Sequence, residues 1–393
     1  MKQGILTINA GSSSIKFALF PLARPISPDA EVSGQIDGIG TNATKMVAKD
    51  RDGKKIADQA IAGEQVSHDV AFDALLKWFM ATHAGWEIVA VGHRVVHGGE
   101  RYSQPTVVDD TVLGHLTSFI PLAPLHEPHN VAGIRALQAL LPGVPQIACF
   151  DTAFHRSQPD VAQTFGLPRA LSAEGIKRYG FHGLSYEYIA RALPEHSHRA
   201  SGRVVVAHLG NGASMAAMVN RKCVATTLGF STIDGLLMGT RCGNLDPGVI
   251  LHLMETKKLS VKDMTTMLYK ESGLLGVSGI SQDMRTLLAS DKPEAQEAVD
   301  LFCYRIAREL GSLVAASGGI DALVFTGGIG EHAAEIRRRV CLLSEWLGIR
   351  LNPEANARHE IVISAGNSSV DVLVIPTNEE WMMAHHAQTL LAL

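Results

Sequence analysis

Apolar residues occur along the chain in short runs that end in small or polar residues. Residues 5–20 (ILTINAGSSSIKFALF) read as a strand, a polar Gly/Ser turn and a second strand. Residues 204–219 (VVVAHLGNGASMAAMV) repeat this order, with Asn and Gly in the turn. The pattern therefore predicts a β-hairpin at the start of each half of the chain.

A helix and a further strand are expected after each hairpin. Residues 69–83 carry apolar side chains at helical spacing and lead into a strand and a Gly-rich turn at 92–99. Residues 298–317 are again helical in pattern and lead into a strand and a Gly-rich turn at 326–332. The two halves of the chain thus share a second unit in the same order.

A third matched pair completes the repeat, with apolar runs at 145–150 and 370–375 that each end in polar residues. Three matched units in one order predict a duplicated α/β protein. We expect an N-terminal domain of residues 1–150 with a terminal helix at 380–393, and a C-terminal domain of residues 151–379. Two such domains imply an active-site cleft between them, because ligands of α/β proteins lie at the carboxyl ends of strands.

Composition narrows the class of protein. Of 393 residues, 46% are hydrophobic and 19% are charged, which is enough apolar material for folded cores. The formal net charge of -4 lacks the basic excess typical of nucleic-acid binders. The start of the chain has no signal-peptide pattern, no run is long enough to cross a membrane, and the five cysteines form no CxxC pair. These features predict a cytoplasmic protein with free thiols that binds neither nucleic acid nor membrane.

Neither common phosphate-binding motif is present. The chain has no GxxxxGK[ST] and no GxGxxG, so the candidates are the small-residue turns at Gly11–Ser14, Gly210–Gly212 and Gly327–Gly330. Backbone N–H groups in such turns can surround an anion. Any one of them is more commonly a plain hairpin turn, but three in a duplicated architecture favour nucleotide binding.

Nine stretches, spread over nearly the whole chain and in family order, resemble the acetate kinases of the acetokinase family, within the sugar kinase/Hsp70/actin superfamily. They are NAGSSSIKF (9–17), GHRVVHGG (92–99), FDTAFH (150–155), RYGFHGLS (178–185), HLGNGAS (208–214), MGTRCGNLDPG (238–248), SGLLGVSGISQDMR (272–285), TGGIGEH (326–332) and PTNEE (376–380). The resemblance implies duplicated actin/Hsp70-like (ribonuclease H-like) domains around the cleft.

The reaction implied by the resemblance is the reversible, direct in-line transfer of the γ-phosphoryl group of ATP to acetate. It would give ADP and acetyl phosphate, with Mg²⁺ or Mn²⁺ required. A carboxylic acid is already ionised at neutral pH, so no general base is needed. The obstacle is repulsion between two anions, which calls for Arg side chains, a metal and a hydrogen-bond donor.

The resemblance also assigns roles to particular residues. Arg94 and Arg241 lie in Gly-rich turns and would bind the substrate and stabilise the transition state, respectively. His182 would donate to a γ-phosphate oxygen. Asp151 matches the family's active-site acid, and we expect it to organise metal-bound waters or the Arg side chains. The acyl pocket would be formed by Val96, Leu125 and Phe181.

The metal and nucleotide positions follow by the same correspondence. Asn9 and Glu379 match the Mg²⁺ positions and end corresponding strands of the repeat. The residues that match the nucleotide-binding segments are Lys16, His208, Leu209, Gly210, Asn211, Gly212, Asp283, Met284, Arg285, Gly328, Ile329, Gly330, Glu331 and His332. The family also implies a homodimer.

Two positions depart from the family pattern. His332 replaces the Asn common at the end of GIGEN, which affects a contact near the nucleotide. Thr232 replaces a Pro that lines the pocket, so a propionate or butyrate kinase remains an alternative, because one methylene changes discrimination by only about 1–3 kcal/mol.

Three other functional interpretations fit the sequence less well. An ATP-driven chaperone or filament protein would need a peptide-binding domain or polymer surfaces. A sugar kinase would need an Asp base and polar groups that bind hydroxyls. His93 and His97 have the i, i+4 spacing of a zinc pair but lie in a Gly-rich, non-helical context without a clustered third ligand.

Overall fold

The computed structural model describes residues 1–393, which fold into two compact units. Unit 1 comprises Met1–Ala153 and Asn378–Leu393, and unit 2 comprises Phe154–Thr377. The first boundary lies three residues after the expected one, and the returning segment begins at Asn378. No helix combines the length and apolarity needed to cross a membrane.

Unit 1 is built on one mixed sheet with the strand order β5-β4-β3-β2-β1-β6-β8-β7. Strands β1, β6 and β8 are parallel, and β2 to β5 extend the sheet as an antiparallel ladder. The strands are β1 Lys2–Ala10, β2 Ser14–Pro21, β3 Val32–Asp37, β4 Lys45–Asp50, β5 Lys55–Ala60, β6 Trp86–Val95, β7 Thr106–Val107 and β8 Gln146–Phe150.

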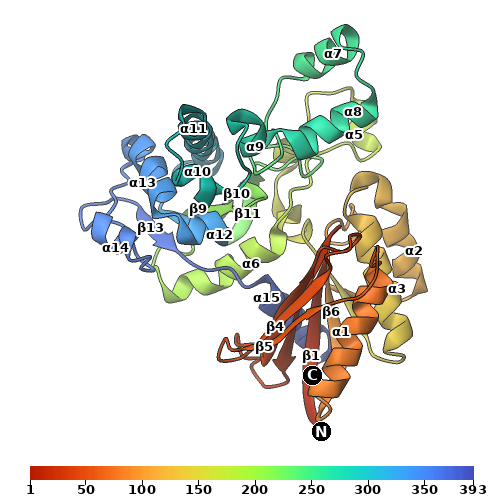
Figure 1. Cartoon of the computed structure of the whole chain (residues 1–393). Helices are drawn as coiled ribbons and strands as arrows, with labels where there is room; N and C mark the ends of the chain where they lie inside the picture. Colours follow the sequence, from red (N-terminus) through yellow and green to blue (C-terminus); the bar gives the residue numbers. More distant parts are fainter. The chain divides into compact units, whose positions relative to one another are not determined.

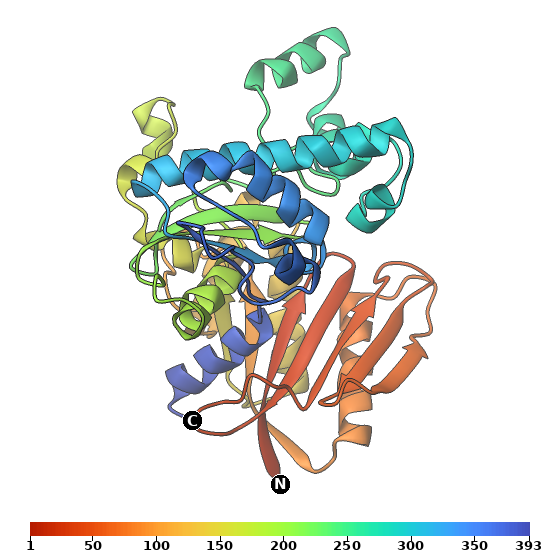
Figure 2. The ribbon, with the colours of Figure 1, turned by 90° about the vertical axis from the view of Figure 1, so that its left-hand side faces the viewer.

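Helices cover both faces of this sheet (Figure 1, Figure 2). Helix α1 begins after Ser67, whose side chain accepts from the Val70 N–H, and its apolar side packs on the sheet with Phe72 and Leu75 fully buried. Helix α15 lies against β1 and β6, where a side chain at Gly92 would contact Met383. The helices of unit 1 are α1 His68–Thr82, α2 Asp110–Ser118, α3 Glu127–Leu140 and α15 Glu379–Leu391.

Unit 2 repeats the central part of the first sheet. Its strand order, β11-β10-β9-β12-β13, matches the order β3-β2-β1-β6-β8 of unit 1, with a hairpin at the start of each. This match confirms the duplicated α/β architecture predicted from the repeat. The strands are β9 Arg203–Leu209, β10 Ala213–Val219, β11 Lys222–Thr226, β12 Ala322–Thr326 and β13 Asp371–Val374.

The long helix α11 packs on β9, β10 and β11, as α1 packs on the sheet of unit 1 (Figure 2). It ends at Gly318, whose φ of 71° gives the left-handed conformation that closes many helices. The helices of unit 2 are α4 Asp160–Gln163, α5 Arg169–Ala173, α6 Gly183–Ala192, α7 Pro247–Thr256, α8 Val261–Thr266, α9 Gly273–Ser278, α10 Met284–Leu288, α11 Pro293–Ser317, α12 Gly327–His332, α13 Ala334–Leu343 and α14 Pro353–Ala357.

Two local predictions were wrong. Residues 326–332 were expected to form a Gly-rich turn, but residues 327–332 form the short helix α12, which continues directly from β12. The turn predicted at 92–99 begins later, because β6 continues to Val95. Gly92 therefore lies in a strand, where its lack of a side chain makes room for α15.

Candidate functional site

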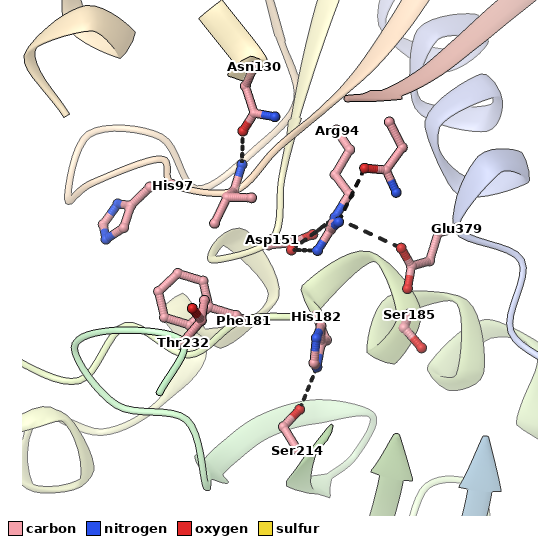
Figure 3. A network of polar contacts seen from close by, with 12 residues as sticks. Arg94, His97, Asn130, Asp151, Phe181, His182, Ser185, Ser214, Thr232 and Glu379 are labelled. Atoms are coloured by element: carbon pink, nitrogen blue, oxygen red, sulfur yellow. Dashed lines mark hydrogen bonds and ion pairs between the residues drawn. The ribbon is translucent and has the colours of Figure 1, made fainter. Parts of the chain in front are cut away.

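The parallel strands of unit 1 bring three polar side chains together at one edge of the sheet. Asn9 lies near the end of β1, Arg94 near the end of β6, and Asp151 directly after β8. The carboxyl ends of parallel strands meet at the same edge, so residues far apart in sequence become neighbours. With Glu379, the first residue of α15, they form what we call the Arg94 cluster (Figure 3).

Arg94 holds this cluster together through its guanidinium group. Its Nε donates to both carboxylate oxygens of Asp151 at 3.0 Å, and its Nη2 donates to Asp151 Oδ2 at 2.5 Å. Its Nη1 donates to Asn9 Oδ1 at 3.2 Å. Burial opposes the positive charge, but Asp151 and Glu379 outweigh it and raise the pKa of Arg94. Arg94 therefore stays charged, and its guanidinium group is held in one orientation.

Negative charge exceeds positive charge around Glu379. Its Oε2 lies 3.9 Å from Arg94 Nε. Burial raises the pKa of Glu379 above its usual value, and the nearby carboxylates of Asp151 and Glu380 add to the effect, while Arg94 and Lys16 lower it. The fully ionised cluster would thus be stabilised by a further cation.

Sequence reasoning missed the side chains that support the loop after β6. Asn130 accepts from the Val96 N–H at 3.0 Å and donates to the Ala10 carbonyl at 2.9 Å, so one amide joins the ends of β1 and β6. Glu127 Oε2 accepts from the His97 N–H at 3.2 Å. Thr152 Oγ1 accepts from the Gly98 N–H at 3.0 Å.

A signal for two of these side chains is present in the sequence. Glu127 and Asn130 lie three residues apart on α3 and share its buried face with Val131 and Ile134. Polar residues on the apolar side of an amphipathic helix are unusual, and they normally bond to backbone groups that would otherwise be unpaired. Burial raises the pKa of Glu127 to about 8, so at neutral pH this carboxyl is largely protonated.

In unit 2, His182 precedes the first residue of α6 and has a left-handed backbone, with a φ of 59°. Its Nδ1 lies 2.8 Å from Ser214 Oγ on β10, and that oxygen lies 2.5 Å from the hydroxyl of Tyr186 (Figure 3 shows His182 and Ser214). The ring of His208 stacks on the His182 ring with centroids 4.4 Å apart. These four residues form what we call the His182 cluster.

His182 and Arg241 face the same point of the turn between β9 and β10. A methyl group added to Gly212 would lie 3.5 Å from His182 Nε2 and 3.8 Å from Arg241 Nη1. Arg241 is held by its Nη1, which donates to the Thr232 carbonyl at 3.0 Å. The turn predicted to bind phosphate thus lies beside a histidine nitrogen and a guanidinium group.

A pocket of about 510 Å³ adjoins this turn. Its walls include apolar side chains, notably Leu288, and flexible polar ones. They are formed by Gly210, Asn211, Gln282, Asp283, Met284, Arg285, Leu288, Gly328, Ile329, His332 and Ala333. A pocket of this size that combines apolar side chains with several polar groups fits a nucleoside.

Some predicted nucleotide-binding residues do not line this pocket. The Glu331 carboxylate accepts from the N–H groups of Gly327 and Thr377, so it fixes the start of α12. His208 lies against His182, and its Nδ1 is 2.8 Å from Ser185 Oγ. Lys16 belongs to unit 1, where it is paired with Asn9 across the β1–β2 hairpin. Leu209, Gly212 and Gly330 belong to the strand, turn and helix that frame the pocket.

The predicted acyl-pocket residues divide between the units. Val96 is buried and Leu125 is half-buried in unit 1. Phe181 is buried in unit 2, and its carbonyl accepts from His155 Nε2 at 2.8 Å.

Of the two histidines with the spacing of a zinc pair, His93 forms a hydrogen bond with Gln146 Oε1 at 2.7 Å, and burial lowers the pKa of His93 to about 4. No group of three or more His, Cys, Asp or Glu side chains is arranged to hold a metal.

Comparisons with known proteins agree over the whole chain. The model of the acetokinase family matches residues 4–385. An acetate kinase of Rhodopseudomonas palustris is 54% identical over 391 residues, which cover 98% of each chain. A solved propionate kinase from Francisella tularensis is 37% identical with a TM-score of 0.90, and it covers 98% of this chain and 99% of its own. A solved acetate kinase from Porphyromonas gingivalis is 35% identical with a TM-score of 0.88, over 99% of this chain and 100% of its own.

Proposed function

The chain belongs to the acetokinase family, and we propose that it transfers the γ-phosphoryl group of ATP reversibly to acetate, giving ADP and acetyl phosphate. The observation that carries this proposal is the convergence of His182 Nε2 and Arg241 Nη1 on Gly212, beside the nucleoside-sized pocket. A phosphoryl group at this turn would lie beside a histidine nitrogen and a guanidinium cation, which suits its negative charge.

The Arg94 cluster of unit 1 is suited to bind a carboxylate substrate. Arg94 presents a fixed guanidinium, the group that binds carboxylates most specifically. Asp151 has both oxygens occupied by Arg94, so we assign it to orienting that guanidinium rather than to removing a proton. Acetate needs no base, because it is already ionised at neutral pH.

The side chains of Asn9 and Glu379 are chemically suited to hold a magnesium ion. They offer an amide oxygen and a carboxylate oxygen, and Mg²⁺ commonly takes one or two protein oxygens and completes its shell with water and phosphate. The excess negative charge around Glu379 also favours a cation there. When bound, the ion would neutralise phosphate charge; Mn²⁺ is the chemical alternative.

Acetate is the substrate that the 54%-identical relative's name supports. Propionate is the second candidate, because the solved relative from Francisella tularensis is named a propionate kinase. We further propose a homodimer. The five cysteines of the chain form no disulfide, which supports a cytoplasmic location.

A hydroxylamine trap tests the function directly. The purified protein is incubated with ATP, Mg²⁺ and hydroxylamine, together with acetate, propionate, butyrate or glucose, and both acyl hydroxamate and ADP are measured. We expect hydroxamate with acetate, less with longer acids, and no glucose-dependent ADP.

The variant Arg241→Ala serves as the inactive control in this assay. We expect its turnover to fall at least about 100-fold with the fold intact, because it loses a cation at the phosphoryl group. Glucose-dependent ADP without hydroxamate would overturn the proposal, and stronger activity with propionate than with acetate would select the second candidate.

A further inference from the structure

Resting on the proposed function, we propose that Tyr186 and Ser214 form a hydrogen-bond relay that holds His182 neutral, with its proton on Nε2. Tyr186 donates to Ser214, and Ser214 donates to Nδ1 of His182. Neither Tyr186 nor Ser214 would touch substrate, so both are positioning residues.

The geometry of the relay is tightly constrained. Ser214 and Tyr186 are both fully buried, and the two contacts of Ser214 Oγ measure 2.8 Å to His182 Nδ1 and 2.5 Å to the Tyr186 hydroxyl. Tyr186 lies one helical turn after His182, and its N–H donates to the His182 carbonyl at 3.1 Å. One turn of α6 and one residue of β10 thus fix the imidazole.

Proton counting leaves two possible states for Nδ1 of His182. A serine hydroxyl has one proton and two acceptor lone pairs, so Ser214 donates to His182, donates to Tyr186, or accepts from both. If it donates to His182, Nδ1 is an acceptor and the ring is neutral with its proton on Nε2. In the other two arrangements, Nδ1 itself must carry a proton.

The surroundings of Nε2 favour the first state. Nε2 faces the same point above Gly212 as the guanidinium of Arg241, and a second cation beside this permanent charge is disfavoured. A neutral ring that donated from Nδ1 would leave Nε2 as an acceptor, facing the negative oxygens that the proposed reaction brings to this turn. Only the Nε2–H tautomer is both neutral and a donor there.

The imidazole ring of His208, beside His182, also has a hydroxyl group as its partner. His208 stacks on His182, and the Nδ1 of His208 lies 2.8 Å from the hydroxyl of Ser185. Ser185 and Tyr186 are consecutive residues of α6, so this helix contacts His208 directly through Ser185 and reaches His182 through Tyr186 and Ser214. Helix α6 therefore orients the imidazole pair.

Nuclear magnetic resonance of protein labelled with ¹⁵N-histidine tests the tautomer without relying on activity. The His182 signals are assigned with His182→Asn, and spectra are recorded at pH 7 without ligands. We expect Nδ1 to resonate as an unprotonated nitrogen and Nε2 as a protonated one. Ser214→Ala should move both signals toward averaged positions.

Kinetics of variants provide the second readout. We expect Ser214→Ala to lower kcat roughly 10- to 100-fold, as is common when the partner of a functional histidine is removed, with KM for ATP within about twofold. Tyr186→Phe should lower kcat less, and it should add nothing in the double variant, because the relay is already broken. Tyr188→Phe, on the same helix but outside the relay, is the matched control.

A protonated Nδ1 in the unmodified protein would overturn the relay, as would unchanged kcat and unchanged ¹⁵N signals in both variants. If Ser214→Ala does not fold, Tyr186→Phe decides the question by the same criteria. A protein that shows the predicted tautomer but forms no hydroxamate would contradict the proposed function and leave the relay intact.

Discussion

Single side chains decide much of the electrostatics around the Arg94 cluster. Glu127 is fully buried on α3 and accepts from the His97 N–H, while its other carboxylate oxygen has no hydrogen-bond partner in the protein. Burial raises its pKa to about 8, with a smaller contribution from the negative charge of Asp151. The folded protein therefore holds a proton on Glu127 at pH values where the unfolded chain has released it.

The pH dependence of stability follows from this difference. The ordinary pKa is 4.5 and the folded value is about 8, so Glu127 favours folding below pH 4.5 and this benefit is lost as the pH rises toward 8. Glu127→Gln retains a neutral side chain of the same shape. We expect it to match the unmodified protein at pH 5 and to raise Tm by at least about 3 °C at pH 8.5.

Thermal unfolding of both proteins at the two pH values measures this effect. Glu297→Gln removes an exposed carboxylate from α11 and should follow the unmodified protein at both pH values. A Tm gain of equal size at pH 5 would contradict the assignment, because Glu127 would then be unfavourable even when protonated.

The sequence predicted these residue-scale features unevenly. Arg94, Asp151 and His182 could be proposed as site residues because each lies in a short motif that resembles a known family. The contact between Ser214 and His182 could not be predicted, because it joins segments far apart in the chain. Asn130 is marked in the sequence only by its place on the apolar side of a helix, and its partners Ala10 and Val96 could not be inferred from that.

At the scale of elements, a buried arginine fixes α12. Arg337 lies on α13, is fully buried, and donates from Nη1 to the carbonyls of Gly330 and Glu331 at 2.9 and 2.8 Å. Its Nε and Nη2 donate to Asn356. Burial lowers the pKa of Arg337 to about 10, so it remains charged at neutral pH and bonds to the carbonyls at the end of α12.

Removing this guanidinium should disturb the nucleotide pocket more than the chemistry. Arg337→Met leaves several buried carbonyl oxygens unpaired, each at a cost of about 1–3 kcal/mol, so we expect at least about 3 kcal/mol of destabilisation. Because α12 lines the pocket, KM for ATP should rise about tenfold while kcat changes less.

Urea unfolding and steady-state kinetics check both parts of this prediction. Arg338→Met is the neighbouring control, because Arg338 forms an exposed ion pair with Glu335 that contributes little. If Arg337→Met were destabilised but bound ATP normally, the link between α13 and the pocket would be refuted.

The helix α12 also shows where sequence reasoning on elements reached its limit. The hairpins and the helices α1 and α11 follow from apolar spacing, which is a local property. In TGGIGEH, the frequent glycines indicated a turn, but the segment is helical, with its start fixed by Glu331 and its last carbonyls by Arg337. Tertiary contacts overrode local propensity.

At the scale of the whole molecule, α7 is an unusual surface. None of its residues is buried, although it contains Val249 and Leu251, which are 39% and 67% exposed. Helices α7 and α8 stand out from the rest of unit 2 (Figure 1). An apolar helix with no buried residue is typical of an association surface, and we assign it to the proposed homodimer.

Sedimentation velocity tests this assignment. We expect the unmodified protein to sediment at twice the chain mass of 42.1 kDa, and Leu251→Glu to sediment as a monomer, since a charge would be buried at the interface. Val161→Glu alters an apolar side chain that is 83% exposed on α4 and should leave the dimer intact. A dimer unaffected by Leu251→Glu would place the interface elsewhere.

The path of the chain through unit 1 constrains how the protein can be made. Helix α15 packs on β1 and β6, and Arg24 donates to the carbonyls of Ala392 and Leu393 at 2.7 and 2.8 Å. A ribosome therefore releases every residue of unit 2 before the last piece of unit 1 emerges. During synthesis, the face of the unit 1 sheet that later receives α15 therefore stays uncovered until unit 2 has been made. A nascent chain stopped before residue 378 would also lack Glu379. Because this apolar face is exposed during synthesis, we expect chaperones to bind unit 1 more than unit 2 on the nascent chain.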